Sequence, residues 1–355
     1  MSVSDEARKA VGDDAPQDWQ LRPRAHAYNM DDTAGPLKRI LTREEIEEII
    51  EAFEDSDAAA TRARNVYKTL VGWSARLSFG AMLMAALILF SKATVFETTP
   101  VGLETWIWAL MALQGLMLLS SFLLSLTAGR LRPFDRWMRE RASAEHERIM
   151  LFTQVLNADE PQRDGEVALL PLKLEYFRRY QLDVQRKYYR ERGKEHAGAV
   201  RRSTWLRVIA TLLILAAAAP IIAALVGVDL AALLRLQDMP SWSGDHDLKQ
   251  RFFIAISTIG AALQGLLAAM HLMNQDERNA ARYRTTAENL EALATKPLDE
   301  ARAGAAANDQ LAVETFITLV HEQISSEHRE WVSLRALSPE LSLSRLRELN
   351  LPWMR

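Results

Sequence analysis

The chain has 355 residues and no cysteine. Disulfide bonds are therefore excluded, and the absence fits a protein whose bulk lies in the reducing cytoplasm. Familiar enzyme signatures are missing as well, since the sequence contains no Walker loop, no GxGxxG and no GxSxG. We therefore expect no catalytic residues, no enzymatic activity and no cofactor.

Histidines do not complete a metal site either. The pair His321-Glu322 lacks the second histidine of an HExxH motif, because Ser325 stands at that position. His321 and His328 are seven positions apart on one face of an expected helix, but a zinc site needs further ligands. The pattern favours a surface pair, and we expect no metal.

Charge is missing from three long stretches of the chain. No Asp, Glu, Lys or Arg occurs in 105–129, 208–228 or 252–275. A bilayer core of ~30 Å needs about 20 helical residues, so each stretch is long enough to span it. A shorter run, 77–91, spans only if Lys92 reaches an interface or a watery cavity. The alternative is a set of buried helices in a large soluble core. Four such runs favour an all-α, four-span membrane protein.

Positive charge flanks these runs unevenly. Clusters of Lys and Arg stand before the first and third spans and after the second and fourth, whereas the connections within each pair carry only Lys92, Arg235 and Lys249. The positive-inside rule therefore predicts that both termini are cytoplasmic. We expect no signal peptide, because "MSVSDEARKAVGDD" has no apolar core.

The sequence ALQGL occurs twice, at 112–116 and 262–266, in the second span of each pair. Downstream, RERASAE at 139–145 is similar to RYRTTAE at 282–288. The first copy is seven residues longer between these two anchors, which is two helical turns and would keep a continuous helix in phase. Chance similarity is the alternative. We interpret the pattern as two parallel two-span hairpins that arose by duplication.

Long helices are expected to extend the spans into a cytoplasmic helical assembly. Thr42 and Glu45 form a capping box ahead of apolar residues at helical spacing. The last helix has an a/d seam for packing, which Glu327 interrupts and for which an arginine partner is expected. The seam residues are Val313, Ile317, Val320, Ile324, Trp331 and Leu334.

The predicted organisation begins with a flexible acidic N-terminal arm at 1–41. A first helix-hairpin unit follows at 42–156, with spans at about 77–96 and 105–128, and then a linker at 157–171. The second helix-hairpin unit is 172–295, with spans at about 207–228 and 252–274. A linker at 296–308, a packing helix at 309–337 and a tail at 338–355 complete the chain.

The pattern resembles the SLATT group of two-span membrane proteins, which are associated with nucleotidyltransferase and SLOG genes in bacterial conflict systems. The resemblance rests on a hairpin with a Trp/Arg approach, on 139–145, and on "VHEQISSEHREW" at 320–331. This chain departs from the simplest pattern because it holds two hairpins. The resemblance implies an inner-membrane effector of nucleotide-dependent antiphage defence, which opens pores that kill or arrest the infected cell.

A basic segment at 173–202 is the best candidate for a ligand site. It has ten Lys/Arg and four acids, with aromatic residues interleaved. Cations neutralise phosphates and aromatic faces stack on bases, so the composition suits a nucleotide or a short single-stranded nucleic acid. The alternative is a helix whose aromatics pack inward and whose arginines meet anionic lipid or the acidic N-terminal segment. The candidates are Arg178, Arg179, Tyr180, Arg186, Lys187, Tyr189 and Arg190.

Polar residues within the spans are candidates for lining a pore. Gln114 and Gln264 could line a polar path or bond between helices, and Lys92 is an ionisable residue at membrane depth that could instead snorkel to the headgroups. We expect a homo-oligomer, guessed to be a tetramer, because four spans give one chain little polar lining. Expected partners are membrane lipid, a nucleotide second messenger or short single-stranded nucleic acid, and a nucleotidyltransferase that makes the ligand. A non-conducting scaffold that recruits soluble partners is the alternative function.

Overall fold

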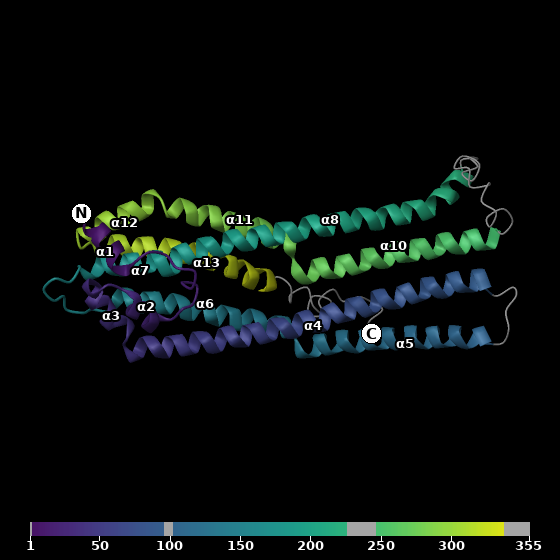
Figure 1. Ribbon diagram of the computed structural model, residues 1–355, viewed down its shortest axis with the longest axis horizontal. Coiled ribbons are helices and arrows are strands. Elements are labelled where there is room, and N and C mark those ends of the chain that lie inside the picture. Colours follow the sequence, from purple (N-terminus) through teal and green to yellow (C-terminus); the bar gives the residue numbers. More distant parts are fainter. Residues whose placement is uncertain (1, 96–101, 226–245, 337–355) are drawn as a thin grey trace, which may run out of the picture. The chain divides into compact units, whose positions relative to one another are not determined.

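The computed structural model describes residues 2–95, 102–225 and 246–336 (Figure 1). Every regular element in these ranges is a helix, and they contain no β-strand. The chain divides into two compact units. Unit 1 comprises Met1–Thr61, Trp137–Glu195 and Arg278–Arg355, and unit 2 comprises Arg62–Arg136 and His196–Glu277.

Unit 2 contains the apolar parts of four helices that are long enough to cross a membrane. These helices are α4 (Glu44–Val95), α5 (Gly102–Leu131), α8 (Val184–Leu225) and α10 (His246–Asn274). The predicted spans fall on them, except for residue 96 and residues 226–228, which lie outside the described part of the chain. The prediction of an all-helical chain with four helices able to span a membrane is therefore confirmed.

Close packing joins the two helices of each pair. On α10, a Cβ at Gly260 would lie 2.8 Å from Ile214 Cγ1 and 3.1 Å from the carbonyl oxygen of Ala210, both on α8. On α4, a Cβ at Gly80 would lie 2.3 Å from the terminal methyl of the flexible Met117 side chain on α5. Small residues let membrane helices approach closely, and at Gly260 the approach is to the backbone of α8 itself.

Both second spans end at a backbone break. After α5, Arg132 has φ 44° and α6 (Pro133–Asn157) begins; after α10, Gln275 has φ 50° and α11 (Asp276–Leu293) begins. The expected continuous helix is therefore wrong, because a residue in the left-handed region terminates an α-helix. Each break stands 13 positions before the glutamate that closes the downstream similarity, Glu145 or Glu288. The seven-residue difference thus lies between ALQGL and the break.

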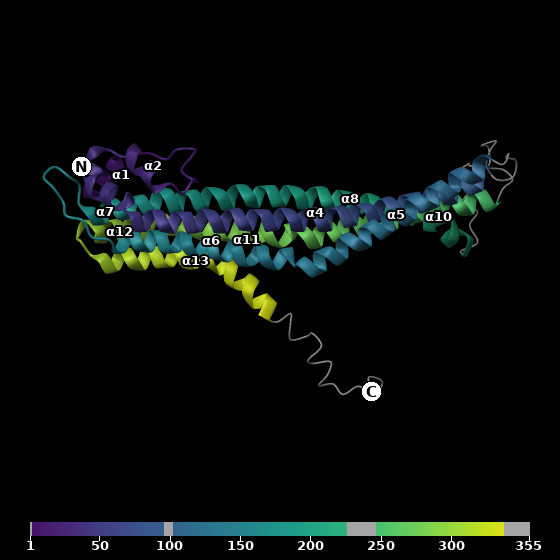
Figure 2. The ribbon, with the colours of Figure 1, turned by 90° about the horizontal axis from the view of Figure 1, so that it is seen from below.

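The core of unit 1 forms around α7 (Leu169–Phe177), whose side chains from residue 170 to residue 177 are all buried. Figures 1 and 2 show α7 beside α1 (Val3–Val11) and α12 (Lys296–Ala306), which both contact it. α13 (Gln310–Ala336) turns its seam inward, with Val313 and Val320 fully buried and Ile317 and Ile324 nearly so. The side chains of Glu327, Trp331 and Leu334 and the tail 338–355 lie outside the described residues.

Residues 2–41 form short packed helices, which corrects the expectation of a flexible arm. They form α1, α2 (Pro23–Asn29), a 3₁₀ turn η1 (Asp32–Ala34) and α3 (Gly35–Leu41). A capping box between Ser2 and Asp5 starts α1, and Val11, Leu37 and Ile40 are fully buried. A few apolar side chains on short helices supply this contact, so the segment lacks the long apolar periodicity by which a helix is recognised in sequence.

The two predicted linkers differ from one another. Residues 296–306 form α12, whose Leu298, Ala301 and Ala305 are buried, so this expectation of a linker is wrong. Residues 158–168 are a true connection between α6 and α7. Arg39 fastens it to α3 through Glu160 and Glu166, each at 2.7 Å. The Arg39 guanidinium lowers the pKa of Glu166 to about 2.

Candidate functional site

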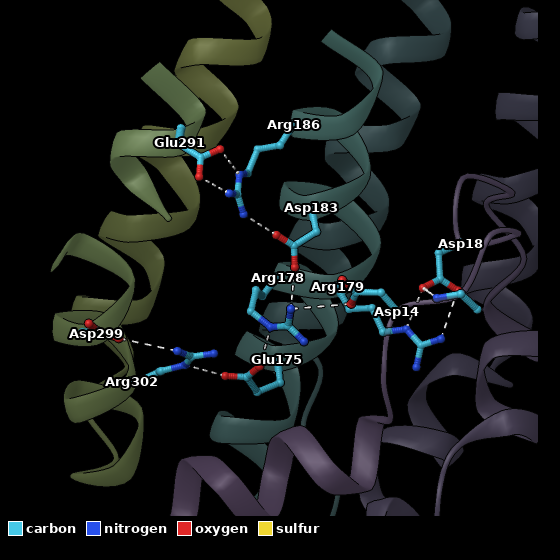
Figure 3. Close-up of polar contacts among 11 residues, drawn as sticks. Asp14, Asp18, Glu175, Arg178, Arg179, Asp183, Arg186, Glu291, Asp299 and Arg302 are labelled. Atoms are coloured by element: carbon cyan, nitrogen blue, oxygen red, sulfur yellow. Dashed lines mark hydrogen bonds and ion pairs between the residues drawn. The ribbon is translucent and has the colours of Figure 1, made fainter. Parts of the chain in front are cut away.

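The predicted ligand residues lie on a helical segment with an irregular turn. A π-helix, η2 (Arg178–Asp183), joins α7 to α8, so the helical run is continuous from 169 to 225. A π-turn widens the helix by one residue and changes the direction of the side chains around it, and such turns are frequent at functional sites. Here the turn presents the neighbouring Arg178 and Arg179 to Asp14 and Asp18 of the N-terminal segment (Figure 3).

Arg178 is the centre of one buried set of ion pairs. Its Nε donates to Glu175 Oε2 at 2.6 Å, and its Nη1 donates to Asp183 and lies 3.6 Å from Asp14 Oδ1. Glu175, which is only 1% exposed, also accepts from Arg302 Nε of α12 at 2.7 Å. Because a buried carboxylate is costly without partners, Glu175 needs both arginines. Arg178 is therefore a packing element between α7, α12 and the N-terminal segment.

Arg179 holds residues 12–22, which we call the N-terminal strap, against η2. Its Nε and Nη2 donate to the two carboxylate oxygens of Asp18 at 2.8 and 3.0 Å, and its Nη1 donates to the carbonyl oxygen of Val11 at 2.8 Å. Gly12 has φ +87°, and a Cβ there would lie 2.9 Å from Arg179 Nη1. The strap thus turns at a residue where only glycine fits without strain.

Tyr180 stacks on a ring of the N-terminal segment. The His26 imidazole lies parallel to it, with ring centroids 3.8 Å apart and an interplanar angle of 16°. His26 Nε2 bonds the carbonyl oxygen of Gln20 at 2.9 Å, and its Nδ1 lies 3.2 Å from the hydroxyl of Tyr176. Burial lowers the pKa of His26 to about 4, so the ring is neutral at pH 7. Burial also raises the pKa of Tyr180 to about 12.

The remaining candidates lie further along α8. Arg186 bonds Asp183 at 2.7 Å and shares Glu291 of α11 with Arg190, which is more exposed than Arg186. The side chain of Lys187 is exposed, whereas Tyr189 is 2% exposed and packs in the aromatic cluster with Tyr188 and Tyr283. The structure thus brings Arg178, Arg179, Tyr180 and Arg186 together and turns Lys187 to the surface.

The arginines of this region are paired with carboxylates of the same chain. Figure 3 shows the arginines and their acidic partners, which lie on the N-terminal strap, α7, η2, α8, α11 and α12. We call this set the ion-pair cluster; it consists of Asp14, Asp18, Glu175, Arg178, Arg179, Asp183, Arg186, Glu291, Asp299 and Arg302. Burial raises the pKa of Asp183, which is the response of a carboxyl among other carboxylates and away from water. In this arrangement the arginines have no positive charge left over for a phosphate.

Sequence reasoning recognised the basic residues and missed most of their acidic partners. The alternative interpretation did name the acidic N-terminal segment, and Asp14 and Asp18 are its contacts. Glu291 lies more than 100 positions from Arg186 and Arg190, its two partners, and carries no local signal. Within the described residues, no group of three His, Cys, Asp or Glu side chains is arranged to hold a metal ion.

The pore-lining candidates in unit 2 have different environments. Gln264 Nε2 donates to Thr211 Oγ1 at 2.9 Å and to the carbonyl oxygen of Arg207 at 3.3 Å, so it bonds across its own hairpin. Gln114, at the corresponding place in the other hairpin, is half-buried. The side chain of Lys92 lies outside the described residues. The observed bonds of Gln264 correspond to helix packing rather than to a polar path.

A hydroxyl cluster that sequence reasoning missed joins α4 to α5. Ser74 Oγ lies 3.0 Å from Ser121 Oγ and 2.7 Å from Ser125 Oγ, and Ser78 Oγ lies 2.7 Å from Ser121 Oγ. The spacing of four residues on each helix is the signal that could have revealed it, because such residues share one helix face. Comparison with protein-family models, with curated proteins and with solved structures finds no match for this chain.

Proposed function

We propose that the protein is the subunit of an oligomeric, pore-forming membrane effector whose opening is controlled by a nucleotide or an oligonucleotide. The observation that carries the proposal is the uninterrupted helical run 169–225. It holds the arginines of the ion-pair cluster near its start and a predicted membrane span near its end. A ligand that rearranges the cluster therefore acts on the same continuous helical run that holds the third predicted span.

Exposed apolar surface supports the oligomer. In a single chain no more than 22% of the most apolar stretch of any span is buried. The remaining surface faces lipid or further copies, and a closed symmetric ring leaves no unmatched interface. We keep the tetramer as the working assembly, with membrane lipid around it.

The topology proposed is a bacterial inner-membrane protein with both termini in the cytoplasm and two parallel, duplicated hairpins. Trp73 and Trp205 precede the first and third spans and are 51% and 66% exposed, as expected for side chains at a headgroup region. The matching breaks at Arg132 and Gln275 support the duplication. Because the chain has no cysteine, single cysteines at Tyr28 and Ser241 test the topology: an impermeant maleimide applied from outside should label only Ser241→Cys.

The role in antiphage defence rests on the resemblance to the SLATT group. A partner nucleotidyltransferase that makes the ligand follows from that role. Expression of the chain with such an enzyme should arrest cell growth only when both are active. Arrest by the membrane protein alone, independent of any nucleotide, would remove the proposed control.

The decisive experiment is ion flux from liposomes that contain the purified protein, with a panel of cyclic nucleotides and short single-stranded oligonucleotides. Flux that one panel member switches on or off is the expected result. Lys187→Glu should weaken the response, because this exposed cation meets incoming phosphates first, while Lys194→Glu on the same helix is the matched control. Tight liposomes under every condition, with insertion verified, would contradict the pore.

A non-conducting membrane scaffold is the second candidate. It is favoured by the polar side chains of the spans, since Ser74, Ser121 and Gln264 bond across their own hairpins. A scaffold of this kind needs no water-filled path. It would leak no ions in any ligand state, and it would co-purify with a soluble partner through unit 1.

A further inference from the structure

Two adjacent residues of the candidate ligand site, Arg179 and Tyr180, are covered by the N-terminal segment. The carboxylate of Asp18 takes both donors on one edge of the Arg179 guanidinium. The imidazole of His26 covers the ring of Tyr180 at 3.8 Å, nearly parallel to it. Both covering residues belong to 12–30, the strap together with α2 and its C-cap. One short segment therefore supplies both an anion and a flat heterocycle.

This pair of contacts reproduces the two chemical parts of a nucleotide. A guanidinium binds a carboxylate and a phosphate with the same fork of N–H donors. A tyrosine ring accepts a nucleobase by parallel stacking, as it accepts the His26 ring here. Burial keeps His26 neutral at pH 7, so the stacked ring is uncharged, as a nucleobase is.

Three further observations favour a ligand over a purely structural role. The contacts are made at a π-turn, a distortion that an α-helix needs for no packing reason of its own. Buried ion pairs are a poor source of stability compared with apolar residues of the same size. The segment also carries two exposed aromatic residues, since Trp19 is 67% and Tyr28 is 88% exposed.

We propose that residues 12–30 are an intramolecular mimic of the nucleotide ligand, with Asp18 in the place of a phosphate and His26 in the place of a base. A nucleotide binds Arg179 and Tyr180 by displacing this segment, while α1 and α3 stay anchored in the core. The inference rests on the proposed function, because it names how that same site is regulated. The displaced state is the signal that unit 1 passes to the run 169–225.

The negative charge of the N-terminal segment is what keeps a nucleotide out of the site. With Asp14 and Asp18 in place, their carboxylates lie against Arg178 and Arg179, and a phosphate is repelled. When the two leave, Arg179 loses both of its carboxylate bonds and Arg178 loses one neighbour. Buried guanidinium groups left without partners are unstable, so the opened site has a strong preference for an anion.

The first test measures nucleotide affinity with the full chain in nanodiscs, using fluorescent ATP and a 5′-phosphorylated tetra-adenylate as probes. Asp18→Asn weakens the mimic and should tighten binding at least fivefold. Asp13→Asn removes the same charge from the strap at an exposed position and is the matched control. Asp14→Asn, whose side chain is 61% exposed, is a second variant that folds even if the first does not. Arg179→Gln should abolish binding.

The second test observes displacement directly. The chain has no cysteine, so a spin label at Trp19→Cys reports only on the strap, and a label at the exposed Leu311→Cys on α13 is the control. Saturating nucleotide should increase the mobility of the first label alone. Two results together would contradict the mimic and leave the proposed function unaffected. They are nucleotide binding without a change in the mobility of the Trp19→Cys label, and equal nucleotide affinities of Asp18→Asn and Asp13→Asn. Binding to no variant, with no flux, would end both.

Discussion

The carboxylate of Asp18 accepts two hydrogen bonds from the guanidinium of Arg179, 161 positions later in the chain. The two side chains are 8% and 7% exposed. This pair attaches a short N-terminal segment to the helix that continues into the third membrane span. Because both charges are buried, each group depends on the other far more than a surface pair would.

We predict that removing either member of this pair destabilises the protein strongly and that the two losses are not additive. Arg179→Ala leaves Asp18 buried without its cation, at a cost of about 3–5 kcal/mol. The double variant with Asp18→Ala should lose much less than the sum of the two single losses, because neither charge remains. Thermal midpoints of all four proteins in one detergent give the coupling. Simple additivity would show that the pair is not a unit.

The spans could be read from the sequence because the membrane imposes a strong pattern of its own. A missing charge over 20 residues is visible without any knowledge of contacts. The break at Arg132 was not predicted, although Pro133 is a common first residue of a helix and signals it. The break at Gln275 has no such signal, because Asn274 and Asp276 flank it and neither proline nor glycine marks the site.

The sequence predicted the basic and aromatic residues of the candidate site but few of their acidic partners, for a physical reason. Basic and aromatic residues are close together on one helix, so composition reveals them. Their partners are single carboxylates on other elements, such as Asp18 on the strap and Glu291 on α11, and an isolated acid has no distinctive local context. The same limit hid the order of residues 1–41, where the stabilising contacts are tertiary.

Gly12 should tolerate no side chain. Its φ of +87° is unfavourable for any L-residue, and a Cβ would also approach Arg179 Nη1 to 2.9 Å. Gly12→Ala should therefore lower stability by more than Gly165→Ala, where φ is also positive, at +83°, but no atom lies within 4 Å of the added Cβ. Backbone strain at a residue such as Gly12 is worth about 1–3 kcal/mol. Equal losses in thermal melts would show that the strap can shift away from Arg179.

Lowering the pH from 6.5 toward 4 should destabilise unit 1 through its buried histidines. Burial on folding lowers the pKa of His26 from 6.5 to about 4. Burial also lowers the pKa of His321 to about 4, although the nearby carboxylate of Glu145 acts to raise it. The folded state thus binds these protons less well than the unfolded state does. Each histidine contributes stability that is complete above pH 6.5 and is lost as the pH falls toward 4, on the order of 3 kcal/mol.

The measurement for this pH effect is the thermal midpoint of the protein between pH 7.5 and 4.5. His26→Phe keeps an aromatic ring against Tyr180 but cannot take up a proton, so its midpoint should fall less steeply over the range. His146, which is exposed on α6, provides the control His146→Asn. Parallel curves for the wild type and His26→Phe would mean that His26 does not sense acid.

A substitution in the serine cluster of the first hairpin tests whether these hydroxyl groups serve helix packing or line an ion path. Ser74, which is 8% exposed, bonds Ser121 and Ser125 on the opposite helix, so its hydroxyl is already satisfied within the chain. Ser74→Ala should destabilise the hairpin by about 1 kcal/mol, a typical value for a hydrogen bond between membrane helices. Thr127→Val is the control, because Thr127 Oγ1 bonds the carbonyl oxygen of Leu123 on its own helix.

The same variant also tests conduction. The ligand-dependent ion conductance of the Ser74→Ala protein should equal that of the wild type, because a side chain that bonds a neighbouring helix does not line a water-filled path. A changed conductance with unchanged stability would instead place this hydroxyl face on the ion path and would remove the observation that favours a scaffold.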